Sequence, residues 1–261
     1  MRAIASERMG GKGIGGAWSL AAKERLWRLA LLTLILWGAW MARDLRWAVV
    51  WDSLPLLLGG LATSWALALL SVGLGGLAAV PLAVARVYGP PGLRHAAAAV
   101  IEVVRATPEL MIVFWIFFAL PGLIGVAISN WTAAVAALSL IASAYLAEVV
   151  RGGLYSVPKA QWEGALSTGL NRPQVFAYVI LPQAARNMVP ALVAQAVILF
   201  KTTSLVYVIG VIEFFRAVVI VNNSAFAPYA LYITMAVGYF LCSWLLTWAV
   251  RRLDPKYILR E

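Results

Sequence analysis

The side chains best suited to act on a solute lie close together near the end of a long apolar run. Lys201 carries a positive charge within that run, and Gln195 and Thr202, seven positions apart, share one helical face. A polar solute needs such partners once it leaves water, because an unpaired polar group costs several kcal/mol. The candidates for the lining of a solute pathway are Gln195, Lys201, Thr202, Thr203, Ser204 and Glu109.

Two interpretations of the charged candidates remain open. A charge at membrane depth costs about 2.5–3.5 kcal/mol, so it usually faces a cavity or a partner. Lys201 could bind the carboxylate of a solute, or it could pair with Glu109 or Glu213 or extend to an interface. Glu109 could bind a solute ammonium, and we favour instead that it neutralises Arg105 one turn earlier. The hydroxyl groups could equally bond to backbone or to another helix.

Composition excludes most other chemistry. The chain has 261 residues, of which 63% are apolar and 12% charged, and its mean hydropathy is +0.86. Soluble domains are about 45–50% apolar and about 25% charged, so a cytosolic enzyme, a disordered tail and a collagenous rod are excluded. One cysteine and one histidine leave almost no material for a disulfide, a His-based triad or a metal cage. We therefore expect an integral membrane protein with no catalytic residues and no metal site.

Long apolar runs predict an all-α fold of about six membrane spans, of which the third is interrupted by Glu102, Arg105, Pro108 and Glu109 and the fifth contains Lys201. The predicted spans are about 29–42, 53–85, 96–122, 132–147, 188–211 and 228–250. Most of the 21 lysine and arginine residues fall on one side of these spans, and basic residues concentrate in cytoplasmic segments. Both termini are therefore expected in the cytoplasm. No small-x-small cleavage site follows the first run, which favours an uncleaved helix over a secretion signal.

The domain organisation follows from the same pattern. Residues 1–25 are expected to form a flexible basic cytoplasmic tail, residues 26–252 the transmembrane domain, and residues 253–261 a short cytoplasmic tail. Small residues along 59–79 favour close packing of the second span, either within the chain or against a second subunit.

The longest polar interval, about 152–186, lies between the fourth and fifth spans. Pro158 suits the first turn of a helix, Gly169 and Asn171 would end that helix, and Pro173 can open another that ends at Leu181-Pro182. An apolar stripe runs along this predicted pair of helices. The pair is thus expected to dock into a partner, and the alternative is an amphipathic hairpin on the membrane surface.

The spacing of this interval resembles a known signature. Glu163-Gly164-Ala165, Gly169, Val179 and Leu181-Pro182 are similar to E-A-A-x3-G-x9-I-x-L-P, the EAA loop of ABC-importer permeases, with Gly164 and Val179 as departures. The resemblance implies that the loop is a coupling helix seated in a groove of an ATPase subunit. The residues implied in this contact are Gln161, Trp162, Glu163, Gly164, Ala165, Leu166, Gly169, Phe176, Leu181 and Pro182.

Further segments extend the resemblance to polar amino acid uptake permeases. The segments 104–108 (V-R-A-T-P), 147–153 (A-E-V-V-R-G-G) and 199–206 (L-F-K-T-T-S-L-V) resemble motifs of that family in family order. Family members often carry an aspartate after the lysine, where this chain has Thr202, so the neighbouring counter-charge is missing. Within that family, the stretch 200–216 is more similar to the permeases of the glutamate/aspartate type.

This resemblance implies the partners and the cofactor. The chain lacks the phosphate-cradling G-x-x-x-x-G-K-[ST] loop, so ATP and Mg²⁺ are expected on a separate ATPase and no cofactor on this chain. The other expected partners are a second permease subunit, identical or related, an extracytoplasmic amino-acid-binding protein, the amino acid and membrane lipid, and not nucleic acid. The expected location is the bacterial inner membrane. The rival functions are an ATP-independent secondary transporter or channel, which should show repeated halves, and a signalling or scaffold subunit.

Overall fold

The structure is a computed structural model that describes residues 20–253, and this part of the chain is helical without strands. The predicted tails therefore lie outside the described residues over 1–19 and 254–261. The helices are α1 (Leu20–Ala42), α2 (Trp47–Asp52), α3 (Leu54–Tyr88), α4 (Pro91–Ala106), α5 (Glu109–Phe114), η1 (Trp115–Ala119), α6 (Leu120–Ile124), α7 (Asn130–Tyr155), α8 (Lys159–Ser167), α9 (Arg172–Val175), η2 (Phe176–Ile180), α10 (Leu181–Thr202), η3 (Thr203–Ile209), α11 (Phe214–Ala225) and α12 (Pro228–Leu253).

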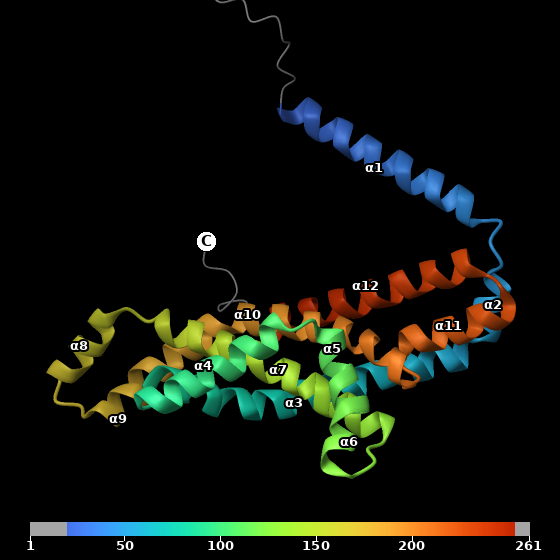
Figure 1. Cartoon of the computed structure of the whole chain (residues 1–261). Helices are drawn as coiled ribbons and strands as arrows, with labels where there is room; N and C mark the ends of the chain where they lie inside the picture. The colour runs from blue at the N-terminus through green and yellow to red at the C-terminus, as the bar shows by residue number, and fades with distance from the viewer. Residues whose placement is uncertain (1–19, 254–261) are drawn as a thin grey trace, which may run out of the picture. The chain divides into compact units, whose positions relative to one another are not determined.

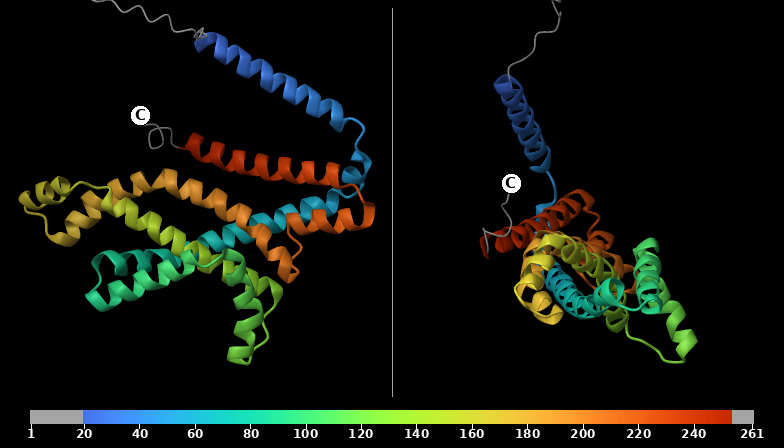
Figure 2. Two further views of the ribbon diagram at one scale, coloured as in Figure 1. Left: turned by 45° about the horizontal axis from the view of Figure 1, so that its top comes forward. Right: turned by 90° about the vertical axis from the view of Figure 1, so that its left-hand side faces the viewer.

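The chain divides into two units, Met1–Leu45 and Arg46–Glu261. In the first unit α1 is a single helix with an ion pair of 2.6 Å between Arg28 and Glu24, one turn apart. All other helices belong to the second unit, where α3, α7 and α10 run side by side and α8 and α9 lie at one end (Figures 1 and 2).

Four helical segments among the described residues are long and apolar enough to cross a membrane: Leu54–Tyr88, Asn130–Tyr155, Arg172–Ile209 and Pro228–Val250. They coincide with the second, fourth, fifth and sixth predicted spans. The first predicted span forms part of α1, which is not among the four. The total of six spans stays a prediction.

The third predicted span is not one straight helix. The helices Pro91–Ala106 and Glu109–Ile124 meet at an angle of 104°, so they form either a broken span or a re-entrant loop. The break falls at Thr107, whose ψ is 135°, because a residue before proline is pushed out of the helical region and Pro108 has no N–H to donate.

The most extensive helix pair, α3 with α7, depends on close approach at glycine. A Cβ at Gly75 would lie 2.5 Å from the Cβ of Ala142 and 2.8 Å from the backbone oxygen of Ser139. At Gly60 it would lie 2.9 Å from the backbone oxygen of Glu213, where α11 begins. The predicted packing role of small residues is confirmed at these two positions, whereas Gly59 has no neighbour within 4 Å.

The helix after α8 does not end at Leu181-Pro182 as predicted. It continues from α9 through the π-helical turn η2 into α10. A proline cannot donate to the preceding turn, and the wider π turn accommodates it, while the side-chain amide of Gln183 donates to the backbone oxygen of Val179 at 2.9 Å. The same sequence, Leu120-Pro121, follows the other π turn, η1.

Candidate functional site

The loop between α7 and α10 has the two-helix form that the sequence predicts. Helix α8 begins directly after Pro158, and Gly169 ends the turn after it with a φ of +87°, which glycine adopts without steric cost. Asn171 then caps α9, because its side chain accepts from the backbone N–H of Gln174 at 3.0 Å. In return, the backbone N–H of Asn171 donates to the side-chain oxygen of Gln174 at 2.9 Å. The turn between the loop helices is therefore fixed by local chemistry.

Aromatic residues join the loop helices to the end of α3. The ring centroids of Trp162 and Phe176 are 6.5 Å apart, and those of Phe176 and Tyr88 are 5.8 Å apart in an edge-to-face arrangement. A groove of about 510 Å³ lies between these elements, and its remaining walls include Leu166 and Val84. The α8–α9 loop thus packs against the end of α3.

The predicted coupling residues divide between two roles. Ala165 is buried, Trp162 and Phe176 are half-buried within the loop, and Leu166 is exposed. The other predicted residues are also exposed: Gln161, Glu163, Gly164, Gly169, Leu181 and Pro182. The exposed set is available to a partner, and the buried set gives the loop its internal core.

The two ends of the loop are held to each other. The side-chain amide of Asn187 in α10 donates to the hydroxyl of Ser156 at 2.8 Å. Gly153 in α7 packs directly on the side chain of Met188, which a Cβ at this position would overlap. Force applied to α8 or α9 therefore reaches α7 and α10 together.

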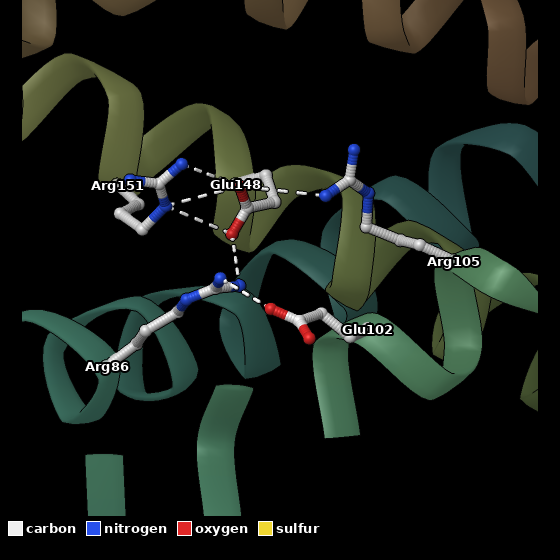
Figure 3. Close-up of polar contacts among 5 residues, drawn as sticks. All are labelled: Arg86, Glu102, Arg105, Glu148 and Arg151. Carbon is white, nitrogen blue, oxygen red and sulfur yellow. Dashed lines mark hydrogen bonds and ion pairs between the residues drawn. The ribbon is translucent and has the colours of Figure 1, made fainter. Parts of the chain in front are cut away.

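A cluster of five charged side chains joins α3, α4 and α7 near these loop ends (Figure 3). The carboxylate of Glu148 accepts from Arg86 at 2.6 Å and from Arg151 at 2.9 Å, and Arg105 lies 3.6 Å from it. Arg86 also bonds to Glu102 at 2.9 Å. Glu148 therefore compensates charge from three arginines on three helices.

The favoured pairing of Glu109 with Arg105 is wrong, and the role of Glu148 was missed. Because α4 ends at Ala106 and α5 leaves at a sharp angle, Arg105 and Glu109 do not share a helical turn. The spacing of Glu148 and Arg151 at i, i+3 was visible in the sequence and indicates a local ion pair. This spacing does not indicate the other partners of Glu148, which are Arg86 on α3 and Arg105 on α4.

The structure separates the predicted pathway residues into three places. Thr202 donates to the carboxylate of Glu109 at 3.3 Å, and Thr203 bonds to the backbone oxygen of Phe200 at 2.7 Å. Lys201 faces a different groove of about 410 Å³, between α10 and α12, where Trp244 and Trp248 form part of the wall. Gln195 is buried and lines a third cavity, between α4, α7 and α10.

Lys201 forms neither of the ion pairs considered for it. Within the described residues no ion pair joins it to Glu109 or Glu213. The carboxylate of Glu213 instead caps α11 by accepting from the backbone N–H groups of Phe215 and Arg216, each at 2.8 Å.

Comparison with known proteins extends these observations over most of the chain. Residues 71–259 match the family described as binding-protein-dependent transport system inner membrane component. The glutamine transport system permease protein GlnP of Escherichia coli (strain K12) is 35% identical over 80% of this chain and 96% of that protein. The glutamate/aspartate import permease protein GltK of Escherichia coli O6:H1 is 34% identical over 66% of this chain and 80% of that protein.

Solved structures show the same fold. The crystal structure of an amino acid ABC transporter with histidines has a chain with a TM-score of 0.77 and 29% identity, covering 82% of this chain and 99% of that chain. The MetNI methionine ABC transporter in an inward-facing conformation has a TM-score of 0.67 at 20% identity, over 79% and 98% of the two chains, and shows the fold alone. The resemblance seen in the motifs is thus confirmed, and the chain belongs to the family of binding-protein-dependent transport system inner membrane components, the permeases of ABC transporters.

Proposed function

We propose that this chain is the membrane-spanning permease subunit of an ATP-driven importer that carries polar amino acids across the inner membrane. The observation that carries the proposal is the match in sequence to amino acid permeases over nearly their whole length. The projecting α8–α9 loop, with its exposed Glu163, Leu166 and Gly169, supports contact with a separate ATPase.

The partners follow from this role. Two permease chains, identical or related, form the pathway, an extracytoplasmic binding protein delivers the amino acid, and ATP and Mg²⁺ act on the ATPase. The chain itself binds no cofactor and performs no covalent chemistry. Both termini lie in the cytoplasm, on the side of the α8–α9 loop.

The substrate preference rests on two observations. The stretch 200–216 resembles the glutamate/aspartate type, and a relative named for glutamate and aspartate is 34% identical. Lys201, in the groove between α10 and α12 whose other polar side chains are Ser243 and Thr247, would then meet the second carboxylate. Glutamine is the second candidate, because the permease named for glutamine matches over 96% of its length.

The test is uptake into proteoliposomes that contain the permease, its ATPase and its binding protein. Labelled glutamate, aspartate, glutamine, arginine and histidine are offered with ATP, without ATP and with a non-hydrolysable analogue. Accumulation of glutamate or aspartate only with ATP supports the full proposal, and glutamine alone shifts the preference. Uptake without ATP supports a secondary transporter or channel and overturns the mechanism.

A further inference from the structure

An apolar groove of about 420 Å³ lies between α2, α3 and α12 in the second unit. Its walls include Leu57 of α3 and Ile233, Val237 and Leu241 of α12. It is distinct from the groove of Lys201, which lies between α12 and α10. Because α3 and α12 both contain segments that are long and apolar enough to cross a membrane, this groove lies among lipid chains.

The floor of the groove is formed by Phe214 and Gly238, which pack on each other. A Cβ at Gly238 would lie 2.6 Å from the ring of Phe214, so a larger residue would displace this ring. Phe214 is itself buried, and its ring centroid lies 5.3 Å from that of Tyr239. A ligand in the groove therefore rests on the first residue of α11.

The groove suits a hydrocarbon ligand and not a polar one. Thr234 is the hydroxyl-bearing residue in its wall, and that hydroxyl already donates to the backbone oxygen of Ala230 at 2.8 Å. Leu58 and Leu241 are 54% and 52% exposed. A polar solute here would lose hydrogen bonds to water without gaining others, whereas an alkyl chain would cover the exposed leucines.

The length of the groove fits a lipid chain better than a membrane helix. From Ile233 to Leu241 it follows α12 for about 12 Å, at 1.5 Å per residue. The hydrocarbon core of a membrane is about 30 Å thick, so this length lies within one leaflet. A spanning helix of a second copy would need a seam through both leaflets.

Helix α2 marks the end of the groove at which a lipid headgroup would lie. It lies beside α12 at the end of the second unit opposite α8 and α9 (Figures 1 and 2). Trp47 and Trp51 of α2 line the groove, and tryptophan is enriched at the depth of lipid headgroups. With the α8–α9 loop in the cytoplasm, as proposed above, this end lies in the outer leaflet.

Arg46, directly before Trp47, supplies a cation at this end. Its side chain is exposed, and it donates through Nη1 to the backbone oxygen of Ala225 at 2.7 Å. Within residues 20–253 no carboxylate forms an ion pair with it, and the nearby Asp44 pairs with Arg43 at 3.2 Å. The backbone contact fixes the guanidinium, which can bind a phosphate through its other N–H groups.

We propose that this groove binds a glycerophospholipid of the outer leaflet. Its phosphate lies on Arg46, and one acyl chain lies between α3 and α12 on Phe214. Lipid chains are as apolar as leucine, so the chain alone gives little selectivity and the phosphate contact holds the molecule in place. This inference goes beyond the proposed function and relies on it only for the choice of leaflet.

The experiment is photolabelling of the purified, delipidated permease–ATPase complex in detergent. The probe is phosphatidylglycerol with a diazirine in one acyl chain, and the labelled peptides are mapped after irradiation. We expect label to concentrate in residues 54–61 and 233–241. Unlabelled phosphatidylglycerol should displace the probe at least tenfold better than a diacylglycerol with the same chains, because only the former carries a phosphate.

Three variants separate the chain contact from the phosphate contact. Val237→Trp fills the groove and should reduce labelling at least fivefold. Leu245→Trp, an equally exposed position on α12 that lines neither of its grooves, should change labelling less than twofold. Arg46→Gln should remove the preference for phosphatidylglycerol over diacylglycerol while the labelled peptides stay the same.

Three results would overturn the proposal. The first is wild-type label spread evenly along the exposed face of α12. The second is equal displacement of the probe by phosphatidylglycerol and diacylglycerol. The third is efficient cross-linking of Leu58→Cys to a second permease chain, which would show that protein covers the groove. The labelling pattern and the displacement ratio are measured on wild type, so neither depends on how well a variant folds.

Discussion

Replacing Glu148 by glutamine should destabilise the second unit far more than the same change at Glu102. Glu148 faces three arginines and is 16% exposed, whereas Glu102 bonds to Arg86 alone and is 64% exposed. Removing one partner of a buried ion pair costs about 3–5 kcal/mol. An exposed pair contributes about 0–1 kcal/mol.

The expected loss of stability for Glu148→Gln is smaller than for a fully buried ion pair. The arginines around Glu148 are between 19% and 40% exposed, so solvent screens part of the repulsion that the substitution leaves. We expect a loss of about 2–3 kcal/mol for Glu148→Gln, because buried charges without compensation are strongly destabilising. At roughly 2–4 °C per kcal/mol for a unit of this size, the unfolding temperature should fall by about 4–12 °C.

The assay is thermal unfolding of the purified permease in detergent and in nanodiscs, at low and high salt. Glu102→Gln is the matched control. Its small effect should vanish in 1 M salt, where the Debye length is about 3 Å and exposed ion pairs are screened. Adding Arg151→Met to Glu148→Gln removes one of the three cations and should restore part of the loss. The reasoning is refuted if Glu148→Gln unfolds within 1 °C of wild type, or if the two glutamine variants behave alike.

Three further substitutions test the loop and the pathway. Glu163→Lys reverses an exposed charge on α8 and should abolish ATPase co-purification and uptake, whereas Asp52→Lys, an exposed reversal outside the loop, should leave the complex assembled. Lys201→Leu should reduce ATP-dependent uptake at least tenfold while keeping or raising the unfolding temperature, since it removes an insertion cost of about 2.5–3.5 kcal/mol. Gly153→Ala should cost about 1–3 kcal/mol through overlap with Met188, and combining it with Met188→Ala in a double-mutant cycle should give less than the sum of the two losses.

The elements of the fold were largely predictable because their signals are local. Long apolar runs marked the four long membrane helices, and Pro158, Gly169 and Asn171 marked the loop helices, since each acts on its own few residues of backbone. Pro108 was equally visible in the sequence. Its consequence, a turn of 104°, was missed because the length of the apolar run indicated a single span.

The site was less predictable because its contacts join distant parts of the chain. Arg86 and Glu148 are 62 positions apart. Helical periodicity predicts the face of the helix on which each residue lies, but it does not predict which residue of another helix lies opposite. The same limit applies to the pathway residues. Lys201 and Thr202 are adjacent in sequence, yet one faces α12 and the other bonds to Glu109 on α5.

The last turns of α7 decide how movement of the loop reaches the membrane helices. Glu148 binds α3 through a contact of 2.6 Å and α4 through Arg105 at 3.6 Å, while Gly153 packs on α10. Of these connections the one to α4 is the longest and the most exposed, and α4 ends at the sharp break before Pro108. When the loop is pushed, α3, α7 and α10 should therefore move as one body, with α4 held mainly through the bond of 2.9 Å between Glu102 and Arg86. Crosslinking α4 to α7 should then reduce ATP-dependent uptake more than crosslinking α3 to α7, because it removes the larger relative movement.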